Sequence, residues 1–423
     1  MVATDFAKTQ KTIFSLLFIG YANYAYNRKS VSMAFPALMD AGLSKNDAGL
    51  IASSQNLAFA ISKFLGGILS DRVSARILFS SGLFLSGAVT ILYASSTSLS
   101  TQVLLWFLNG IGQGAGWPAA AKVIRHWSSP DQFGTWWSVI SASTNVSGAI
   151  TPFLAIYLIL NYGWPASLVF AGSLSVGLSV ICLLYVVDSP TELGWNSFAT
   201  ESKKDLKLAS TDTWRDIIKS PFLWLLSICY MVVYCVKTSA VDWGQMYLHD
   251  DLNQSQYVGS AFTSSLETGG FVGGVASGYI TDWLMSRPHN PNRSPRMPIA
   301  FAFTVGLAIG LHVFIFWVNE TSTQLFITST GFWLGACMYG SISIFGVVAA
   351  ETTPPHLSGT AHAVVALAAN MGGVMAGLPF SLIAKYHNWG AVFILLEVIS
   401  VITALIMLVC WNIHGRVEKL KNE

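Results

Sequence analysis

Long apolar blocks separated by short polar breaks run along the whole chain. Each block is close to the roughly 20 residues that a helix needs to cross a bilayer at a rise of 1.5 Å per residue. We therefore expect an all-α, multi-pass membrane protein, whose first block serves as both first span and insertion signal. Twelve transmembrane helices are predicted, at approximately 12–38, 47–70, 77–95, 101–124, 133–160, 165–187, 222–248, 256–283, 297–318, 324–350, 358–385 and 389–411.

The second half of the chain repeats the first. Residues 67–71 (Gly-Ile-Leu-Ser-Asp) are matched by residues 278–282 (Gly-Tyr-Ile-Thr-Asp). Farther along, 134–148 and 359–373 share Gly-Thr, Asn and Gly at equal spacing. The two offsets are nearly equal, and their difference fits one small insertion in the loop 286–297. A repeat of this kind indicates two six-helix bundles related by an axis along the membrane normal.

The stretch 188–221 differs from its surroundings. It contains several lysines and few large apolar residues, so it predicts a solvated linker. We therefore expect an N-terminal bundle at 1–187, a linker at 188–221, and a C-terminal bundle with its tail at 222–423.

Composition and charge narrow the class further. Hydrophobic residues make up 53% of the chain and charged residues 10%, whereas soluble domains carry about 25% charged residues. Of the 23 basic residues, 17 lie in the termini and in alternate loops, which predicts that both termini and the linker are cytosolic. All five cysteines lie in apolar blocks, and no nucleophile–base set or metal-ligand spacing is apparent. We expect no enzymatic activity, metal, cofactor or nucleic-acid partner.

Four cations inside predicted spans are the main candidates for binding residues: Arg28, Lys29, Lys63 and Lys237. A basic side chain at the centre of a span costs about 2.5–3.5 kcal/mol, so each needs a reason. Arg28 and Lys237 both lie about 16 residues into repeat-related helices, roughly 24 Å along the axis, too deep for simple snorkelling. We expect them to face one another across a central cavity.

An ion pair is the alternative role for these cations. The predicted helices of the first half contain no acid away from their ends, whereas the second half offers Asp242, Glu267 and Glu397. Lys237 therefore has possible partners in its own half, and the other three cations have none. An uncompensated cluster predicts an anionic ligand, and the planar fork of arginine suits phosphate oxygens.

Polar and aromatic side chains near the cations predict a lining for the rest of a substrate. Each of them could equally be a packing residue or an interhelical hydrogen-bond partner. The candidates are Tyr21, Tyr24, Gln55, Asn56, Trp117, Gln245, Glu267, His362 and Asn370.

The loop after the second predicted helix carries a recognisable motif. Residues 67–76 read Gly-x-Leu-Ser-Asp-Arg-x-x-x-Arg, which resembles the loop signature of the major facilitator superfamily. The resemblance implies the fold of that superfamily and a charge latch between neighbouring helices. The latch residues it implies are Asp71, Arg72, Arg76 and, in the repeat, Asp282.

Motifs along essentially the whole chain resemble the organophosphate:phosphate antiporters. They are residues 24–29 (Tyr-Ala-Tyr-Asn-Arg-Lys), 62–64 (Ser-Lys-Phe), 109–118, 133–137 (Phe-Gly-Thr-Trp-Trp), 236–238 (Val-Lys-Thr), 242–245 (Asp-Trp-Gly-Gln), 359–373 and 376–380. Within that family the chain is most similar to members that carry glucose 6-phosphate in the endoplasmic reticulum.

This resemblance implies exchange of glucose 6-phosphate for inorganic phosphate, supplying a lumenal phosphatase. The family's phosphate-binding basic pair falls on Arg28 and Lys237, and its lysine on the second helix falls on Lys63. The C-terminal Lys419 and Lys421 are similar to a dilysine retrieval signal, which agrees with an endoplasmic-reticulum membrane protein.

The residues are also compatible with two other functions. A proton-coupled symporter of a sugar or organic anion would need a titratable acid in the path, and Glu267 or Asp242 could serve. A sugar-phosphate receptor would bind its ligand without transporting it. We expect alternating access by a working antiporter, because both the loop motif and the repeat are complete.

Overall fold

The computed structural model describes residues 2–70, 72–129, 133–196, 219–285, 296–351 and 358–410. The chain divides into two compact units, Met1–Ser202 and Lys203–Glu423, which we call the N-terminal unit and the C-terminal unit. The predicted linker 188–221 lies largely outside the described residues, as does the tail 411–423. The cytosolic placement of both remains a prediction.

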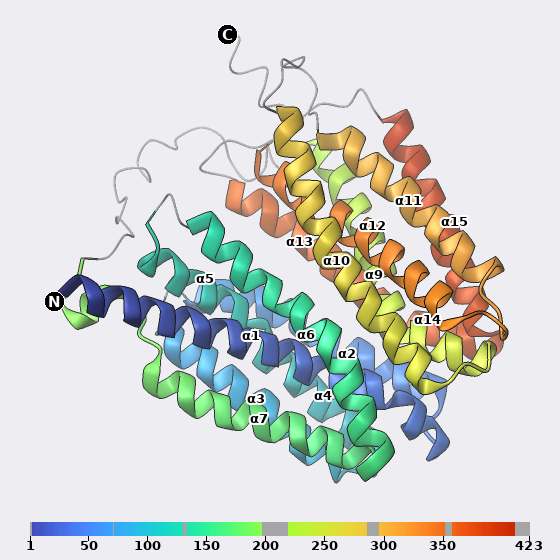
Figure 1. The fold of residues 1–423 in the computed structure, drawn as a ribbon, viewed down its shortest axis with the longest axis horizontal. Coiled ribbons are helices and arrows are strands. Elements are labelled where there is room, and N and C mark those ends of the chain that lie inside the picture. The colour runs from blue at the N-terminus through green and yellow to red at the C-terminus, as the bar shows by residue number, and fades with distance from the viewer. Residues whose placement is uncertain are drawn as a thin grey trace. The chain divides into compact units, whose positions relative to one another are not determined.

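Helices form the regular structure of the described part of the N-terminal unit (Figure 1). Within it α3 packs against α7, α2 against α4, and α1 against α6. The elements are α1 (Val2–Asp40), α2 (Lys45–Ser70), α3 (Ala75–Ala94), α4 (Leu99–Gly114), α5 (Gly116–Trp127), α6 (Phe133–Tyr162), α7 (Trp164–Tyr185) and the short 3-10 helix η1 (Pro190–Leu193).

The described part of the C-terminal unit is built in the same way. The closest helix pairs are α10 with α12 and α9 with α13. The elements are α9 (Pro221–Met246), the π-turn η3 (Tyr247–Asp251), α10 (Gln256–Met285), α11 (Arg296–Phe316), α12 (Gln324–Glu351), α13 (Ser358–Met375), α14 (Leu378–Tyr386) and α15 (Trp389–Val409).

Prolines explain two breaks that divide single predicted spans. Proline has no N–H and clashes with the carbonyl four residues earlier. Pro118 lies four residues after Gly114, where α4 ends, and Pro379 lies four residues after Met375, where α13 ends. The predicted span 101–124 is therefore α4 followed by α5, and the predicted span 358–385 is α13 followed by α14.

Glycines allow the helices around the cationic residues to approach closely. A β-carbon built at Gly110 of α4 would lie 2.5 Å from the backbone oxygen of Gln55 on α2. One built at Gly114 would lie 2.5 Å from the backbone nitrogen of Lys63. Small residues at such crossings are the usual means of close packing between membrane helices. The glycine-rich run of α4 thus positions α2, which carries Lys63.

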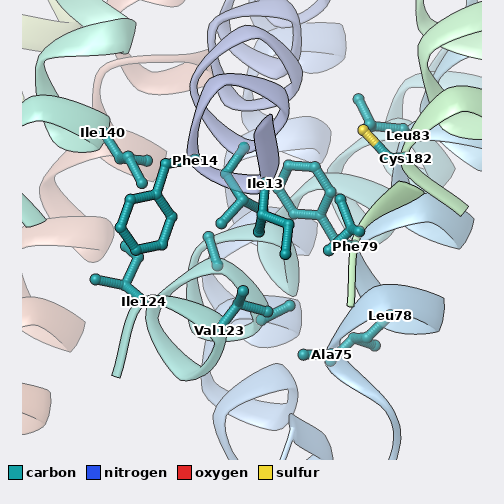
Figure 2. Packing of buried hydrophobic residues seen from close by; sticks show 14 of the residues in the cluster. Ile13, Phe14, Ala75, Leu78, Phe79, Leu83, Val123, Ile124, Ile140 and Cys182 are labelled. Carbon is teal, nitrogen blue, oxygen red and sulfur yellow. The ribbon is translucent and has the colours of Figure 1, made fainter. Parts of the chain in front are cut away.

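An apolar core packs around the first half of α1 in the N-terminal unit. Ile13 and Phe14 of α1 meet Phe79 of α3 and Val123 and Ile124 of α5 in one buried cluster (Figure 2). The rest of the cluster comes from these helices, from α6 and α7, and from single residues at the α4–α5 junction and directly after α7. The residues are Leu17, Tyr24, Ala75, Leu78, Leu83, Ala115, Ala119, Ala120, Trp127, Ile140, Cys182 and Val186.

The predicted all-α, twelve-span fold is confirmed. Among the described residues, eight helical segments are long and apolar enough to cross a membrane by length and composition alone. The other four are α1, α2, the α4–α5 pair and α10. They are less apolar because they carry Arg28, Lys29, Lys63, the glycine run or Glu267. Part of the polarity that lowers their mean hydropathy therefore comes from candidate site residues.

Candidate substrate-binding site

Two of the predicted cations share one aromatic ring in the N-terminal unit. The guanidinium carbon of Arg28 on α1 lies 4.9 Å from the ring centroid of Phe59 on α2. The ammonium nitrogen of Lys63 lies 5.7 Å from the same centroid. Cation–π contacts of this kind contribute about 0.5–2 kcal/mol. The structure therefore brings Arg28 and Lys63 together, while Lys29, next along α1, is only 7% exposed.

A buried hydrogen-bond network fixes the rotation of α1 next to Arg28. Asn27 is 0% exposed, and its Nδ2 donates to Oγ of Ser175 on α7 at 3.1 Å. Its Oδ1 accepts from Nδ2 of Asn109 on α4 at 2.7 Å and from Oγ1 of Thr90 on α3 at 3.0 Å. Three other helices thus hold one asparagine of α1, and the residue after it is Arg28. Asparagines within an apolar span are the sequence signal for this network, although our list of site residues did not include them.

Removing the centre of this network should destabilise the N-terminal unit. Asn109→Ala leaves Oδ1 of Asn27 with one fewer donor and leaves Nε2 of Gln113, now 2.7 Å from Oδ1 of Asn109, without that acceptor. We expect a loss of about 1–3 kcal/mol in the free energy of unfolding, measured by thermal unfolding in detergent. Asn161→Ala is the control, because Asn161 is exposed and bonds only locally to the carbonyl of Tyr157. Equal stability of the two variants would contradict a structural role for the network.

Lys237 lies between two tyrosine rings in the C-terminal unit. Its ammonium nitrogen is 5.1 Å from the ring centroid of Tyr234, one turn earlier on α9, and 5.4 Å from that of Tyr339 on α12. The hydroxyl of Tyr339 donates to Oε2 of Glu267 on α10 at 2.7 Å. Glu267 is 1% exposed. The sequence had indicated Asp242 or Glu267 as possible ion-pair partners, but in the described residues Lys237 pairs with neither and reaches Glu267 only through Tyr339.

The predicted lining residues have different surroundings. Tyr24 is buried in the core and donates to the carbonyl of Phe79 at 2.6 Å. The rings of Tyr21 and Trp117 pack with their centroids 5.0 Å apart. Their aromatic faces thus serve packing within the N-terminal unit, and a contact of either with substrate stays a prediction.

The remaining lining residues are four amide side chains and one histidine. Gln55 and Asn370 are buried and Asn56 is partly buried. Gln245 is 1% exposed, and neither its Nε2 nor its Oε1 has a hydrogen-bond partner in the described structure. The side chain of His362 lies outside the described residues.

The loop after α2 is held by residues that the motif did not indicate. The ammonium of Lys122 on α5 donates to the carbonyls of Ser70 and Val73. The carboxylate of Asp188 accepts the backbone N–H groups of Ala75 and Arg76 at 3.0 and 2.6 Å, which caps the N-terminus of α3. These contacts fix the two ends of the loop to the rest of the N-terminal unit.

The charge latch implied by that motif stays a prediction. Asp71 and the side chain of Asp282 lie outside the described residues. Arg72 is exposed, and Arg76 is partly buried. In the described part of the chain no group of three or more His, Cys, Asp or Glu side chains could hold a metal ion.

Two helical units, each with cations placed within long apolar helices, indicate a multi-pass membrane protein of the transporter class. A family model for the Major Facilitator Superfamily matches residues 17–377. The chain belongs to this superfamily, and it is therefore a membrane transporter in class and not an enzyme.

Individual proteins extend the comparison. The chain is 31% identical to the membrane sensor protein UhpC of Salmonella typhimurium strain LT2, over 94% of this chain and 91% of that protein. It is 29% identical to a probable hexose phosphate transport protein of Chlamydia muridarum, over 95% and 90% of the two chains. A solved structure of the nucleoside transporter NupG has the same fold, with a TM-score of 0.75 at 12% identity, over 95% of this chain and 99% of that one.

Proposed function

We propose that the protein exchanges a sugar phosphate, most specifically glucose 6-phosphate, for inorganic phosphate by alternating access. The observation that carries the proposal concerns the interactions that two cations, Arg28 and Lys237, make in the structure. Among the described residues, the side chains of Arg28 and Lys237 make no ion pair or hydrogen bond, and each contacts aromatic rings instead. Half-buried cations held in this way within spans favour an anionic ligand.

Phosphate fits this pair better than a carboxylate does. Arginine presents a planar fork of donors to phosphate oxygens, and lysine adds point charges with rotatable donors. We assign the phosphate group to Arg28, Lys29, Lys63 and Lys237. The name of the Chlamydia relative, a probable hexose phosphate transport protein, supports a sugar phosphate as the organic substrate.

Exchange follows from charge without a chemical step. Cations that bind one phosphate together repel each other when it is absent, so the bound anion lowers the barrier to the change of state. The protein then crosses between its states mainly when loaded, with either phosphate or the sugar phosphate.

We further propose that the protein lies in the endoplasmic-reticulum membrane, with both termini cytosolic, and supplies a lumenal phosphatase. The asymmetry of basic residues supports the orientation. The tail lysines Lys419 and Lys421 and the family resemblance support the compartment. Localisation of the tagged full chain, with and without these two lysines, tests the second point.

Uptake of labelled glucose 6-phosphate into proteoliposomes tests exchange directly. We expect uptake into vesicles loaded with phosphate and none into empty vesicles, because an empty site cannot return. Equal uptake in both would contradict obligatory exchange. Uptake that instead required a proton gradient would favour the symporter, with Glu267 as the next residue to substitute.

A second candidate function is a sugar-phosphate receptor. It is favoured by the name of the Salmonella relative, a membrane sensor protein, which is similar to this chain over almost its full length. Saturable binding of glucose 6-phosphate to the purified protein, without flux in any loading condition, would support the receptor over the antiporter.

A further inference from the structure

Gln245, near the C-terminal end of α9, is a buried side chain in an unusual environment. Its side chain is 1% exposed, yet both the donor and the acceptor of its amide lack a partner among the described residues. The neighbouring helix makes room for it, because a β-carbon built at Gly259 of α10 would lie 2.7 Å from Cγ of Gln245. Burying an amide without a hydrogen bond is unfavourable. A ligand that offers both a donor and an acceptor would offset that cost.

Two serines extend this unpartnered polarity along α10. Ser260 directly follows Gly259, and Ser264 lies one turn later; both are buried, and neither hydroxyl has a partner in the described structure. Residues at spacings of four and three share one helix face, so Ser260, Ser264 and Glu267 form a stripe. Glu267 accepts from Tyr339, whose ring lies against the ammonium of Lys237. The stripe therefore leads from Gln245 to the cation that we assign to phosphate.

Three buried amides in the N-terminal unit, one of them next to Arg28, have hydrogen-bond partners. The side chains of Asn27, Asn109 and Gln113 bond to one another and to neighbouring hydroxyls. Those groups are used for structure, whereas the amide of Gln245 and the two serine hydroxyls are not. We infer that their role is to bind a ligand.

We propose that Gln245, Ser260 and Ser264 form a subsite for the hydroxyl groups of the sugar. This inference rests on the proposed function, and it assigns the sugar to the C-terminal unit. It also orients the substrate: the phosphate lies at Lys237, and the sugar extends toward the C-terminal end of α9 and the N-terminal end of α10. Gln245 lies eight residues after Lys237, roughly 12 Å along the helix, a span that a hexose phosphate and the two side chains bridge.

The chemistry of the subsite explains how the site would distinguish its two substrates. Sugar hydroxyls donate and accept, and so do a carboxamide and a serine hydroxyl. A phosphate dianion offers acceptors and a single hydroxyl donor, and when bound at Lys237 it is too small to reach the stripe as well. The subsite thus adds affinity for the sugar phosphate beyond what the shared phosphate site supplies.

Gln245→Leu tests the subsite, because leucine keeps the volume of the side chain and removes its hydrogen bonds. The measurement is the ratio of KM for phosphate to KM for glucose 6-phosphate in proteoliposome exchange. We expect this selectivity to fall about tenfold or more, and Ser264→Ala to act in the same direction with a smaller effect. The melting temperature of the substrate-free Gln245→Leu protein should equal or exceed that of the unsubstituted protein, since an unpartnered buried amide is lost. A purely structural role would instead lower it.

Ser277→Ala is the matched control. Ser277 is a buried serine of the same helix, but its hydroxyl donates to the carbonyl of Gly274 at 2.8 Å, so the selectivity should not change. An unchanged ratio in Gln245→Leu, with both KM values rising together or neither rising, would overturn the subsite and leave phosphate exchange standing. Failure of the unsubstituted protein to exchange phosphate for phosphate would overturn the proposed function itself, and the subsite with it.

Discussion

Arg28→Ala should abolish exchange in proteoliposomes, with a fall in rate on the order of 100-fold or more. Charge-assisted hydrogen bonds to a phosphate are among the strongest side-chain interactions, and truncation of Arg28 removes at least two donors at once. Arg28→Lys should keep a small part of the activity, because the charge remains but the planar fork is lost. Initial rates of phosphate self-exchange, normalised to the amount of reconstituted protein, give the comparison.

The folding of the Arg28 variants can be checked independently. Their thermal unfolding in detergent should be close to that of the unsubstituted protein, because in the described structure the guanidinium makes a ring contact with Phe59 and no hydrogen bond or ion pair. Arg125→Ala is the matched control: Arg125 is an exposed arginine of the same unit at the end of α5, and its loss should leave exchange intact. Normal exchange by a well-folded Arg28→Ala protein would refute the phosphate site.

Lys237→Ala should have an effect of similar size. The ammonium of Lys237 lies between the rings of Tyr234 and Tyr339, and alanine leaves those rings with no cation. We expect phosphate self-exchange to fall on the order of 100-fold. Lys237→Arg should retain measurable exchange, because a guanidinium keeps both the positive charge and the contact with the rings.

Lys385→Ala is the control that shows whether losing any lysine of the C-terminal unit impairs exchange. Lys385 on α14 also lies over a tyrosine, 5.9 Å from the ring centroid of Tyr386, but the repeat gives it no counterpart at the depth of Arg28. Its substitution should leave exchange unchanged. If Lys237→Ala exchanged phosphate as well as Lys385→Ala does, a shared role of Arg28 and Lys237 would be wrong.

The lining residues show what the sequence cannot predict from single positions. Tyr24 and Gln245 looked alike in the sequence, since each is a polar side chain in an apolar helix near a cation. In the structure the hydroxyl of Tyr24 bonds to the carbonyl of Phe79, whereas the amide of Gln245 has no partner in the described part. Whether a polar group already has a hydrogen-bond partner depends on the neighbouring helix that faces it. The spacing of residues along one helix does not contain that information.

Features that repeat along the chain could be read from the sequence alone. The lengths of the apolar blocks determined the helices, because the thickness of a bilayer sets how many residues a span needs. The positions of charges within predicted spans identified Arg28, Lys63 and Lys237 as candidates, because a cation in a span is too unfavourable to be incidental. Prolines marked the breaks at Gly114 and Met375 only once the helices were known.

Contacts between helices could be decided only by the tertiary structure. That Arg28 and Lys63 share Phe59, that Asn27 is held by three other helices, and that Tyr339 links Lys237 to Glu267 all join residues far apart in the chain. The reason is physical. Hydropathy belongs to each residue and can be summed along a segment of sequence, so it predicts helices without knowledge of their neighbours. A hydrogen bond or a ring contact depends on the rotation and crossing of two helices, which packing alone determines.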